Sequence, residues 1–199
     1  MSPAHVLEPT YDALRRRLIA GAWPAGQRLE AGKLAQDLAV SMTPVRDSLN
    51  RLTGERLVRA SAGEGFQVPL LDATELVALI DWHQMLLELA LRALEAGNGT
   101  FDMPHGHNGV AEHSAILFGA IAASCDNPEL DWAIGNAAAR LGPYRRIEEM
   151  FLADASAEIS RIETLARAGS WEAMSHLVQH YHERRHRLAP QLAHAARER

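Results

Sequence analysis

The sequence predicts a mainly α-helical protein, with a small winged helix-turn-helix domain over residues 1–70 and an all-helical bundle over residues 71–199. Three observations support this prediction. Two short segments with helical spacing of apolar residues flank a tight turn, and two strand patterns joined by a glycine-bearing turn follow them. No strand pattern appears after Val68. We therefore expect a β-hairpin wing, and only helices beyond it.

The first expected helix spans Glu8 to Ala20. Tyr11, Leu14 and Leu18 recur on one face of it and predict its buried side. The arginine run Arg15 to Arg17 lies mostly outside that face. These arginines suit either contact with phosphates or simple solvation, and the pattern alone does not choose between the two.

The helix-turn-helix pattern follows the first helix. Leu34 and Leu38 lie one helical turn apart, as do Val45 and Leu49, so each segment has one apolar stripe. The turn Ala39-Val40-Ser41 separates the two stripes. The pattern indicates two short packed helices, the second placed to enter a DNA major groove. An ordinary αα-hairpin is the alternative.

The second of these helices has a clear start signal. Ser41 or Thr43 can cap it, and Pro44 fits the first turn, where a missing N–H costs nothing. Its outward face offers groups that hydrogen-bond phosphates or base edges. These are Thr43, Arg46, Asp47, Asn50 and Arg51.

The predicted wing consists of the strands Leu57 to Ser61 and Gly65 to Pro69, with Ala62-Gly63-Glu64 as the turn. This order of motifs resembles the GntR family of bacterial transcription regulators. The resemblance covers roughly residues 8–70. It is carried by PAGQRL (Pro24 to Leu29), LAQDLAVS (Leu34 to Ser41), TPVRDSLNRL (Thr43 to Leu52), ERLV (Glu55 to Val58) and GFQV (Gly65 to Val68).

The resemblance implies binding to double-stranded operator DNA, in most cases as a repressor. Met42 stands where the family usually has an arginine, which puts the target sequence in question. The expected DNA-contacting residues are Arg15, Lys33, Ser41, Met42, Thr43, Arg46, Asn50, Arg51 and Gly65.

The charge distribution agrees with DNA binding at one end of the chain. Residues 1–70 hold nine Lys or Arg against seven Asp or Glu, whereas residues 71–199 hold eleven against eighteen. The single Cys125 excludes an intrachain disulfide and suits the cytoplasm. No stretch of 18 apolar residues is present, so we expect neither export nor a membrane partner.

The bundle is expected to begin at a capping box formed by Asp72 and Glu75, and to open with a long helix to about Ala96. A loop rich in Gly, Asn and Pro follows, from Gly97 to Gly109. Gly142-Pro143 should break or kink one later helix, an interruption is expected near Asp154, and Pro190 should kink or end the last helix. The later helices are expected at Val110 to Cys125, Glu129 to Leu141, Tyr144 to about Ala168, and from Trp171, with Ser170 as its cap.

A helical bundle behind such a head resembles the FadR-like branch of the GntR family, whose bundle is called the FCD domain. The segments AIAASCDNPEL (Ala120 to Leu130) and LARAGSWEA (Leu165 to Ala173) carry this weaker resemblance. Many members hold a divalent metal on an aspartate and three histidines. The corresponding positions here are Ser114, Phe118, Ile159 and His180, so we expect neither a bound metal nor another cofactor.

A small effector would then be held by other groups. The resemblance places His83 on the first bundle helix, facing the cavity. We expect a more apolar pocket than usual, with one or two polar anchors. The expected effector-contacting residues are His83, Phe118, Asn136, Arg140, Tyr144, Ile159 and His180, although each polar one equally suits a structural or surface role.

Three functions follow from these patterns. The first is a homodimeric transcription regulator that responds to a small molecule. The second binds DNA without an effector and uses the bundle only for dimerisation. The third is a helical metalloenzyme that uses His105, His107 and His113. We expect no enzyme, because the sequence shows no nucleophile elbow, P-loop, dinucleotide-binding glycine motif or zinc-binding cysteine pairs.

Overall fold

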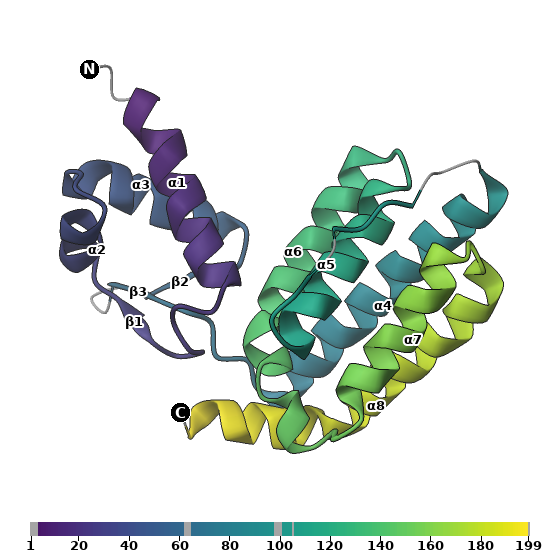
Figure 1. Cartoon of the computed structure of the whole chain (residues 1–199). Coiled ribbons are helices and arrows are strands. Elements are labelled where there is room, and N and C mark those ends of the chain that lie inside the picture. Colours follow the sequence, from purple (N-terminus) through teal and green to yellow (C-terminus); the bar gives the residue numbers. More distant parts are fainter. Residues whose placement is uncertain (1–3, 62–64, 98–100, 105, 199) are drawn as a thin grey trace. The chain divides into compact units, whose positions relative to one another are not determined.

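The computed structural model describes residues 4–61, 65–97, 101–104 and 106–198. The chain divides into two compact units. The first comprises Met1–Leu70 with Ala196–Arg199, and the second comprises Leu71–Ala195. Figure 1 shows a small mixed unit at the N-terminal end of the sequence and a bundle of helices after it.

The first unit contains three helices and a three-stranded sheet. The helices are α1 (Ala4–Ile19), α2 (Ala31–Asp37) and α3 (Met42–Gly54), and the strands are β1 (Arg28–Leu29), β2 (Arg59–Ser61) and β3 (Gly65–Gln67). The sheet is antiparallel in the order β1-β3-β2. The predicted fold class, a winged helix-turn-helix followed by helices, is confirmed.

The sheet contains one strand that the sequence pattern did not predict. In β1, Arg28 pairs with Gln67, and on the opposite side of β3 Arg59 pairs with the same residue. The hairpin of β2 and β3 is the predicted wing. Its expected turn, residues 62–64, lies outside the described residues.

The core of the first unit joins α1 to α3. Leu14, Val45, Leu49 and Leu52 are completely buried, as the apolar spacing predicted. Helix α1 begins before the expected Glu8 and contains Pro9. Pro9 is the sixth residue of α1, beyond the first four positions whose N–H groups have no intrahelical partner, so it removes one intrahelical hydrogen bond.

The connection from α2 to α3 is a tight turn. Ala39 adopts a left-handed conformation with φ 53°, and the N–H of Val40 donates to Ala35 O at 3.0 Å. Ser41 is the N-cap residue of α3 and Pro44 lies in its first turn, but the Ser41 side chain makes no capping hydrogen bond. The expectation that the Ser41 hydroxyl caps the helix is therefore wrong.

All regular elements among the described residues of the second unit are helices. Its elements are α4 (Ala73–Ala96), α5 (Val110–Ala123), α6 (Pro128–Arg145), a short 3-10 helix η1 (Glu148–Met150), α7 (Ala155–Arg167) and α8 (Trp171–Arg197). Helices α5 and α6 pack on each other and both contact α4, while α7 packs on α5 (Figure 1).

Helix α4 starts as predicted. Asp72 Oδ1 accepts from the N–H of Glu75 at 2.8 Å, and Glu75 Oε2 accepts from the N–H of Asp72 at 3.0 Å. This reciprocal pair satisfies two donors that a helix start would otherwise leave unpaired. Leu76, Leu87 and Ala90 of α4 are completely buried.

Two prolines do not end helices as expected. Helix α6 continues through Pro143 to Arg145, and α8 continues through Pro190 to Arg197. Pro143 lies in the last turn of α6, where it removes one intrahelical bond. Burial of Leu141 and Tyr144 on either side offsets that loss. The interruption expected near Asp154 is real, because α7 starts at Ala155.

The junction between the two units is short. On its first side, the N–H of Val68 donates to Gln27 O at 2.9 Å, and the N–H of Gly26 donates to Val68 O at 3.0 Å. On its second side, the N–H of Leu71 donates to the Tyr144 hydroxyl at 2.7 Å. Only residues 69–70 lie between these anchors.

None of the described helices combines the length and the apolar character needed to cross a lipid bilayer.

Candidate functional site

The exposed start of α3 is the first candidate site. Ser41, Met42 and Thr43 are solvent-exposed there, and so are Arg46 and Asn50 one and two turns further along the helix. Helix α3 is buried on its other side through Val45 and Leu49. The structure therefore brings five of the predicted DNA-contacting residues onto one open face.

Two other predicted DNA-contacting residues are used within the unit. The guanidinium of Arg51 lies 3.8 Å from the centre of the Tyr11 ring, and its Nη1 donates to Glu8 at 2.8 Å. Arg15 lies 3.8 Å from Glu55. Arg51 and Arg15 thus help to fix α1 against the end of α3, a role that the sequence pattern did not predict.

Tyr11 completes this cluster. Its hydroxyl donates to Glu55 at 2.6 Å, and burial, followed by that hydrogen bond and the nearby carboxylate charge, raises the pKa of Tyr11 to about 12. The phenol therefore remains protonated at any physiological pH, and the α1–α3 contact does not change with pH through this group.

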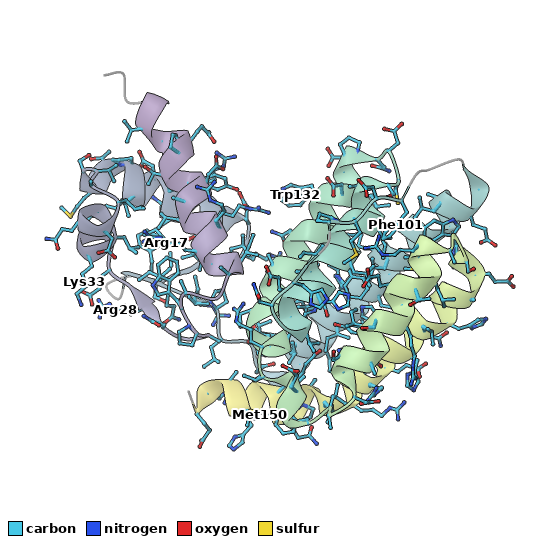
Figure 2. All side chains as sticks on the ribbon, in the orientation of Figure 1. Arg17, Arg28, Lys33, Phe101, Trp132 and Met150 are labelled. Carbon is cyan, nitrogen blue, oxygen red and sulfur yellow. The ribbon has the colours of Figure 1, made fainter. Side chains whose placement is uncertain are left out.

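Strand β1 and helix α2 contribute a second group of cationic side chains. Gly65 opens β3 with φ 84°, a backbone conformation that favours glycine, and the Arg28 guanidinium lies 4.0 Å from where a Cβ on Gly65 would stand. Lys33 is exposed and pairs with Glu30 at 2.7 Å. Figure 2 shows Arg28 and Lys33 on the same side of this unit.

Arg28 is a candidate residue that sequence reasoning missed. The sequence PAGQRL was recognised as a motif, but its two-residue strand was not. The available signal was the alternation of an exposed Arg28 with a buried Leu29 directly after Gly26, whose φ is 82°. A strand of two residues is too short for a reliable periodicity.

A buried chain of hydrogen bonds in the bundle is the second candidate site. His83 Nδ1 lies 2.8 Å from His182 Nε2, and His182 Nδ1 lies 2.7 Å from Val178 O. Arg145 Nη2 lies 3.4 Å from His83 Nε2. His83 and His182 are essentially inaccessible to solvent, and Arg145 is only 3% exposed.

This geometry fixes the tautomers of both histidines. A carbonyl oxygen only accepts, so His182 Nδ1 carries a proton, and its Nε2 accepts from His83 Nδ1. His83 Nε2 is then the acceptor for the Arg145 guanidinium. Burial, then the Arg145 and His182 charges, lower the pKa of His83 well below its usual value. Burial lowers the pKa of His182 to about 3. Both rings are therefore neutral near pH 7.

Aromatic rings surround the histidine pair. The Phe118 ring packs edge-on against His83 and against Tyr181, with 5.2 Å between centroids in each case. The predicted Phe118 and Ile159 are both completely buried. A small pocket borders this region, and Arg145, Tyr181 and His182 contribute to its wall.

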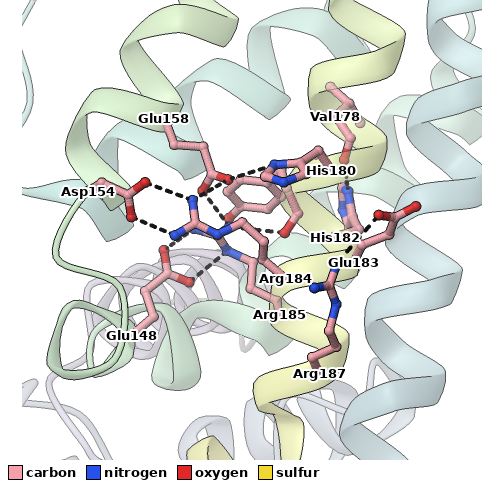
Figure 3. A network of polar contacts seen from close by, with 11 residues as sticks. Glu148, Asp154, Glu158, Val178, His180, His182, Glu183, Arg184, Arg185 and Arg187 are labelled. Carbon is pink, nitrogen blue, oxygen red and sulfur yellow. Dashed lines mark hydrogen bonds and ion pairs between the residues drawn. The ribbon is translucent and has the colours of Figure 1, made fainter.

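An ion-pair network stands beside the pocket (Figure 3). Arg185 donates to Glu148 at 2.7 and 2.9 Å and to Glu158 at 2.6 Å, while Arg184 bonds Glu158 at 2.9 Å and also pairs with Asp154. The two carboxylates of Glu148 and Glu158 are therefore balanced by the two guanidinium groups of Arg185 and Arg184.

His180 does not face the cavity as predicted. Its side chain is 59% exposed and lies on the outside of α8, 3.7 Å from Glu158. His182, two residues further along, occupies the buried position instead. Two residues rotate a helix position by about 200°, so a register error of two exchanges the inner and outer faces.

The remaining predicted effector residues lie at different depths. Tyr144 is buried in the pocket wall and its hydroxyl is bonded to Leu71. Asn136 is 9% exposed, and Arg140 is intermediate, both on α6. The pocket wall includes Tyr144 but neither of these two residues.

The positions that hold metal in relatives are mostly apolar here. Ser114, Phe118 and Ile159 are buried. Among the loop histidines, the ring of His107 stacks on that of His113 at 3.7 Å, and His113 Nε2 bonds Glu163 at 2.7 Å; His105 lies outside the described residues. Within the described part of the chain, no group of three or more His, Cys, Asp or Glu has a metal-binding arrangement.

Comparison with known proteins identifies the first unit. Residues 8–68 match the model of the bacterial regulatory proteins of the gntR family. Residues 8–68 therefore carry the gntR-type DNA-binding domain that the motifs predicted.

Two curated relatives share part of the sequence. The Nta operon transcriptional regulator of Aminobacter aminovorans is 39% identical over 67 residues, which is 34% of this chain and 32% of the relative. The HTH-type transcriptional regulator YdhC of Bacillus subtilis (strain 168) is 26% identical over 85 residues, or 41% of this chain and 38% of the relative. The matches thus span about a third of the length of these relatives.

Solved structures share the fold over most of the chain. A transcriptional regulator GntR from Rhodococcus sp. RHA1 superposes with a TM-score of 0.72 at 18% identity, covering 93% of this chain and 97% of the other. McbR/YncC of E. coli superposes with a TM-score of 0.66 at 19% identity and the same coverage of each chain. At these identities the likeness concerns the fold alone.

Proposed function

We propose that this protein is a sequence-specific DNA-binding transcription regulator of the bacterial cytoplasm, and that it acts as a repressor without enzymatic activity. The observation that carries the proposal is the open face of α3, where Thr43, Arg46 and Asn50 stand exposed on a helix whose other face is buried. Such a helix fits a major groove, and these side chains can bond phosphates and base edges. Arg28, on β1 beside the wing, would add a phosphate contact.

We further propose that the bundle forms a homodimer through α4. Trp82, Met85 and Leu89 are 47%, 53% and 54% exposed and lie on one stripe of that helix. Large apolar side chains in one stripe favour burial against a partner. We propose a second copy of the chain as the partner. When two copies of α4 pack in an antiparallel arrangement, the side chains of one stripe fit those of the other.

In that arrangement, a two-fold axis crosses α4 between Trp82 and Met85. Each Trp82 then meets the other copy's Met85, and each Leu89 meets the small Ala78. Glu75 near the start of the helix comes close to Arg92 near its end, so opposite charges meet at both rims. Two winged-helix units joined in this way would read an operator with two-fold symmetry.

We also propose that a small molecule regulates the protein by binding in the bundle pocket. The support is the pocket's buried polar groups and its wall residue Tyr144, which holds the backbone of Leu71 at the junction to the DNA-binding unit. A ligand that shifts Tyr144 would change that junction, and hence DNA affinity.

Selection of genomic fragments by the purified full-length chain tests the DNA-binding proposal. Fragments retained at moderate salt should share a palindromic sequence, and the purified duplex should bind at nanomolar concentrations, at least about a thousandfold more tightly than a scrambled duplex. Retention of fragments with no common sequence, together with equal affinity for the scrambled duplex, would contradict sequence-specific regulation.

A further inference from the structure

Met42 is an exposed apolar side chain at the start of the proposed recognition helix. It is the first residue of α3 and is 51% exposed. Among the described residues of the first unit, no other large apolar side chain is exposed. A single exposed methionine is ordinary on a protein surface. This one stands where a recognition helix contacts base edges, and Arg46 follows on the same face one helical turn later.

A glycine of α2 lies beside the thioether of Met42. A Cβ built on Gly32 would stand 3.9 Å from Met42 Sδ, which is an ordinary van der Waals distance. The sulfur atom therefore lies next to the first turn of α2 and not in the core of the unit. Because Gly32 has no side chain, no group from that position covers the thioether. The apolar end of Met42 stays accessible on the face that carries Arg46.

A thioether has a narrow choice of partners in a major groove. It carries no charge and donates no hydrogen bond, so it cannot pair with a phosphate as Arg46 or Lys33 can. Adenine, guanine and cytosine present hydrogen-bonding groups on their edges in that groove, whereas thymine also presents its C5-methyl group. This methyl group is the apolar partner that unmodified DNA offers, and contact with it removes apolar surface of both groups from water.

We propose that Met42 reads a thymine in each half-site of the operator, through contact of its thioether with the C5-methyl group of that base. This inference rests on the proposed DNA-binding function and names one base of its target. A methionine in place of the arginine that the family resemblance implies exchanges a charged contact for an apolar one. Met42 and Arg46 then have different tasks, because Arg46 bonds a base edge or a phosphate and Met42 selects thymine.

Removal of single methyl groups from the DNA tests this proposal. The full-length protein first selects duplexes from a random library, and each thymine of the selected half-site is then replaced by deoxyuridine, which lacks only the C5-methyl group. Fluorescence titration should find a thymine whose replacement weakens binding about fourfold in one half-site and about fifteenfold in both. Selected half-sites without thymine, or an affinity that no replacement lowers, would overturn the proposal.

Met42→Ala locates the contact on the protein. It shortens an exposed side chain and keeps a high helix propensity, so its melting temperature should equal that of the parent. The variant should bind the thymine and deoxyuridine duplexes with equal affinity. Met150→Ala removes a methionine that is 64% exposed on η1, and it should keep the parent's preference for thymine. A Met42→Ala variant that still prefers the thymine duplex would overturn the proposal.

Thr43 is the competing reader, because its exposed side chain also carries a methyl group. Thr43→Ser removes that methyl group and keeps the hydroxyl. Whatever its effect on affinity, this variant should keep the preference for thymine over deoxyuridine, and loss of the preference in Thr43→Ser alone would assign the contact to Thr43 and overturn the proposal. Failure of the proposed DNA-binding function is distinguishable, since the selection would then yield no common sequence.

Discussion

At the scale of single residues, Met42 and Arg46 should decide how the proposed recognition helix α3 reads DNA. Both are exposed at the start of the helix, and Met42 stands where the family resemblance implies an arginine. Arg46→Ala should weaken the binding free energy for the operator by about 1–3 kcal/mol, because a bidentate base contact is removed. Its binding to a scrambled duplex should change little. Met42→Arg should raise affinity for both duplexes through an added phosphate contact.

Fluorescence titration of both variants against the two duplexes measures these changes. Arg187→Ala, which alters an exposed arginine of the bundle, is the control and should match the parent. Parent-like operator binding by Arg46→Ala would mean that α3 is not the reading helix.

The buried histidine pair predicts how stability depends on pH. His83 and His182 are neutral in the folded protein because burial lowers the pKa of each, whereas in the unfolded chain they titrate near pH 6.5. Above that pH neither state binds the protons, and no penalty arises. Below it the unfolded state gains protons, so the free energy of unfolding should fall by up to about 1.4 kcal/mol per pH unit for each histidine.

Urea denaturation between about pH 7 and about pH 5.5 tests this dependence. His182→Gln should flatten the decline by roughly 1 kcal/mol over that range, since one buried histidine is gone. The exposed His176→Gln serves as the control and should decline like the parent. Identical slopes for His182→Gln and the parent would contradict a neutral, buried His182.

At the scale of an element, the start of α4 depends on its capping box. Asp72→Ala removes the acceptor for the Glu75 N–H and should destabilise the bundle by about 1 kcal/mol, whereas Asp72→Asn, which still caps, should cost much less. Thermal unfolding followed by helical circular dichroism gives both values. Equal losses for the two variants would assign the effect to charge and not to capping.

Elements with strong local signals were predictable from the sequence, and elements fixed by tertiary contacts were not. Helix α4 combines a capping box with a long apolar pattern, and both its ends were predicted correctly. The strand β1 exists only because β3 pairs with it, and it has too few residues for a pattern. Pro143 was expected to break or kink its helix, yet α6 continues through it to Arg145, where the neighbouring Tyr144 is buried.

The candidate sites divide in the same way. The exposed face of α3 followed from helical spacing, so its members could be named in advance. The buried partners Arg145 and His182 could not, because their importance comes from a contact with His83, 62 and 99 residues away in the sequence. Arg51 likewise looked free in the sequence but lies over Tyr11 in the fold.

At the scale of the whole molecule, the proposed dimer depends on the exposed stripe of α4. Met85→Glu would place a charge against the partner's Trp82 and should shift the protein from dimer to monomer at micromolar concentration, with loss of operator binding. Sedimentation velocity measures the change. Met150→Glu is the control, since Met150 is 64% exposed but lies on η1, outside the stripe. A dimeric Met85→Glu variant would place the interface elsewhere.

In the proposed dimer, the short junction would also limit which operators can be bound. Only Pro69 and Leu70 lie between the hydrogen bond at Val68 and the one at Leu71, and the ring of Pro69 fixes its own φ torsion. One extra base pair between two half-sites turns one of them by about 34° around the DNA axis and moves it about 3.4 Å along that axis. A linker of two residues would allow little rotation or displacement of the DNA-binding unit to follow such a change in half-site spacing. The proposed dimer would therefore discriminate between operators by half-site spacing. It would bind weakly to operators whose half-sites have the correct sequence but the wrong spacing.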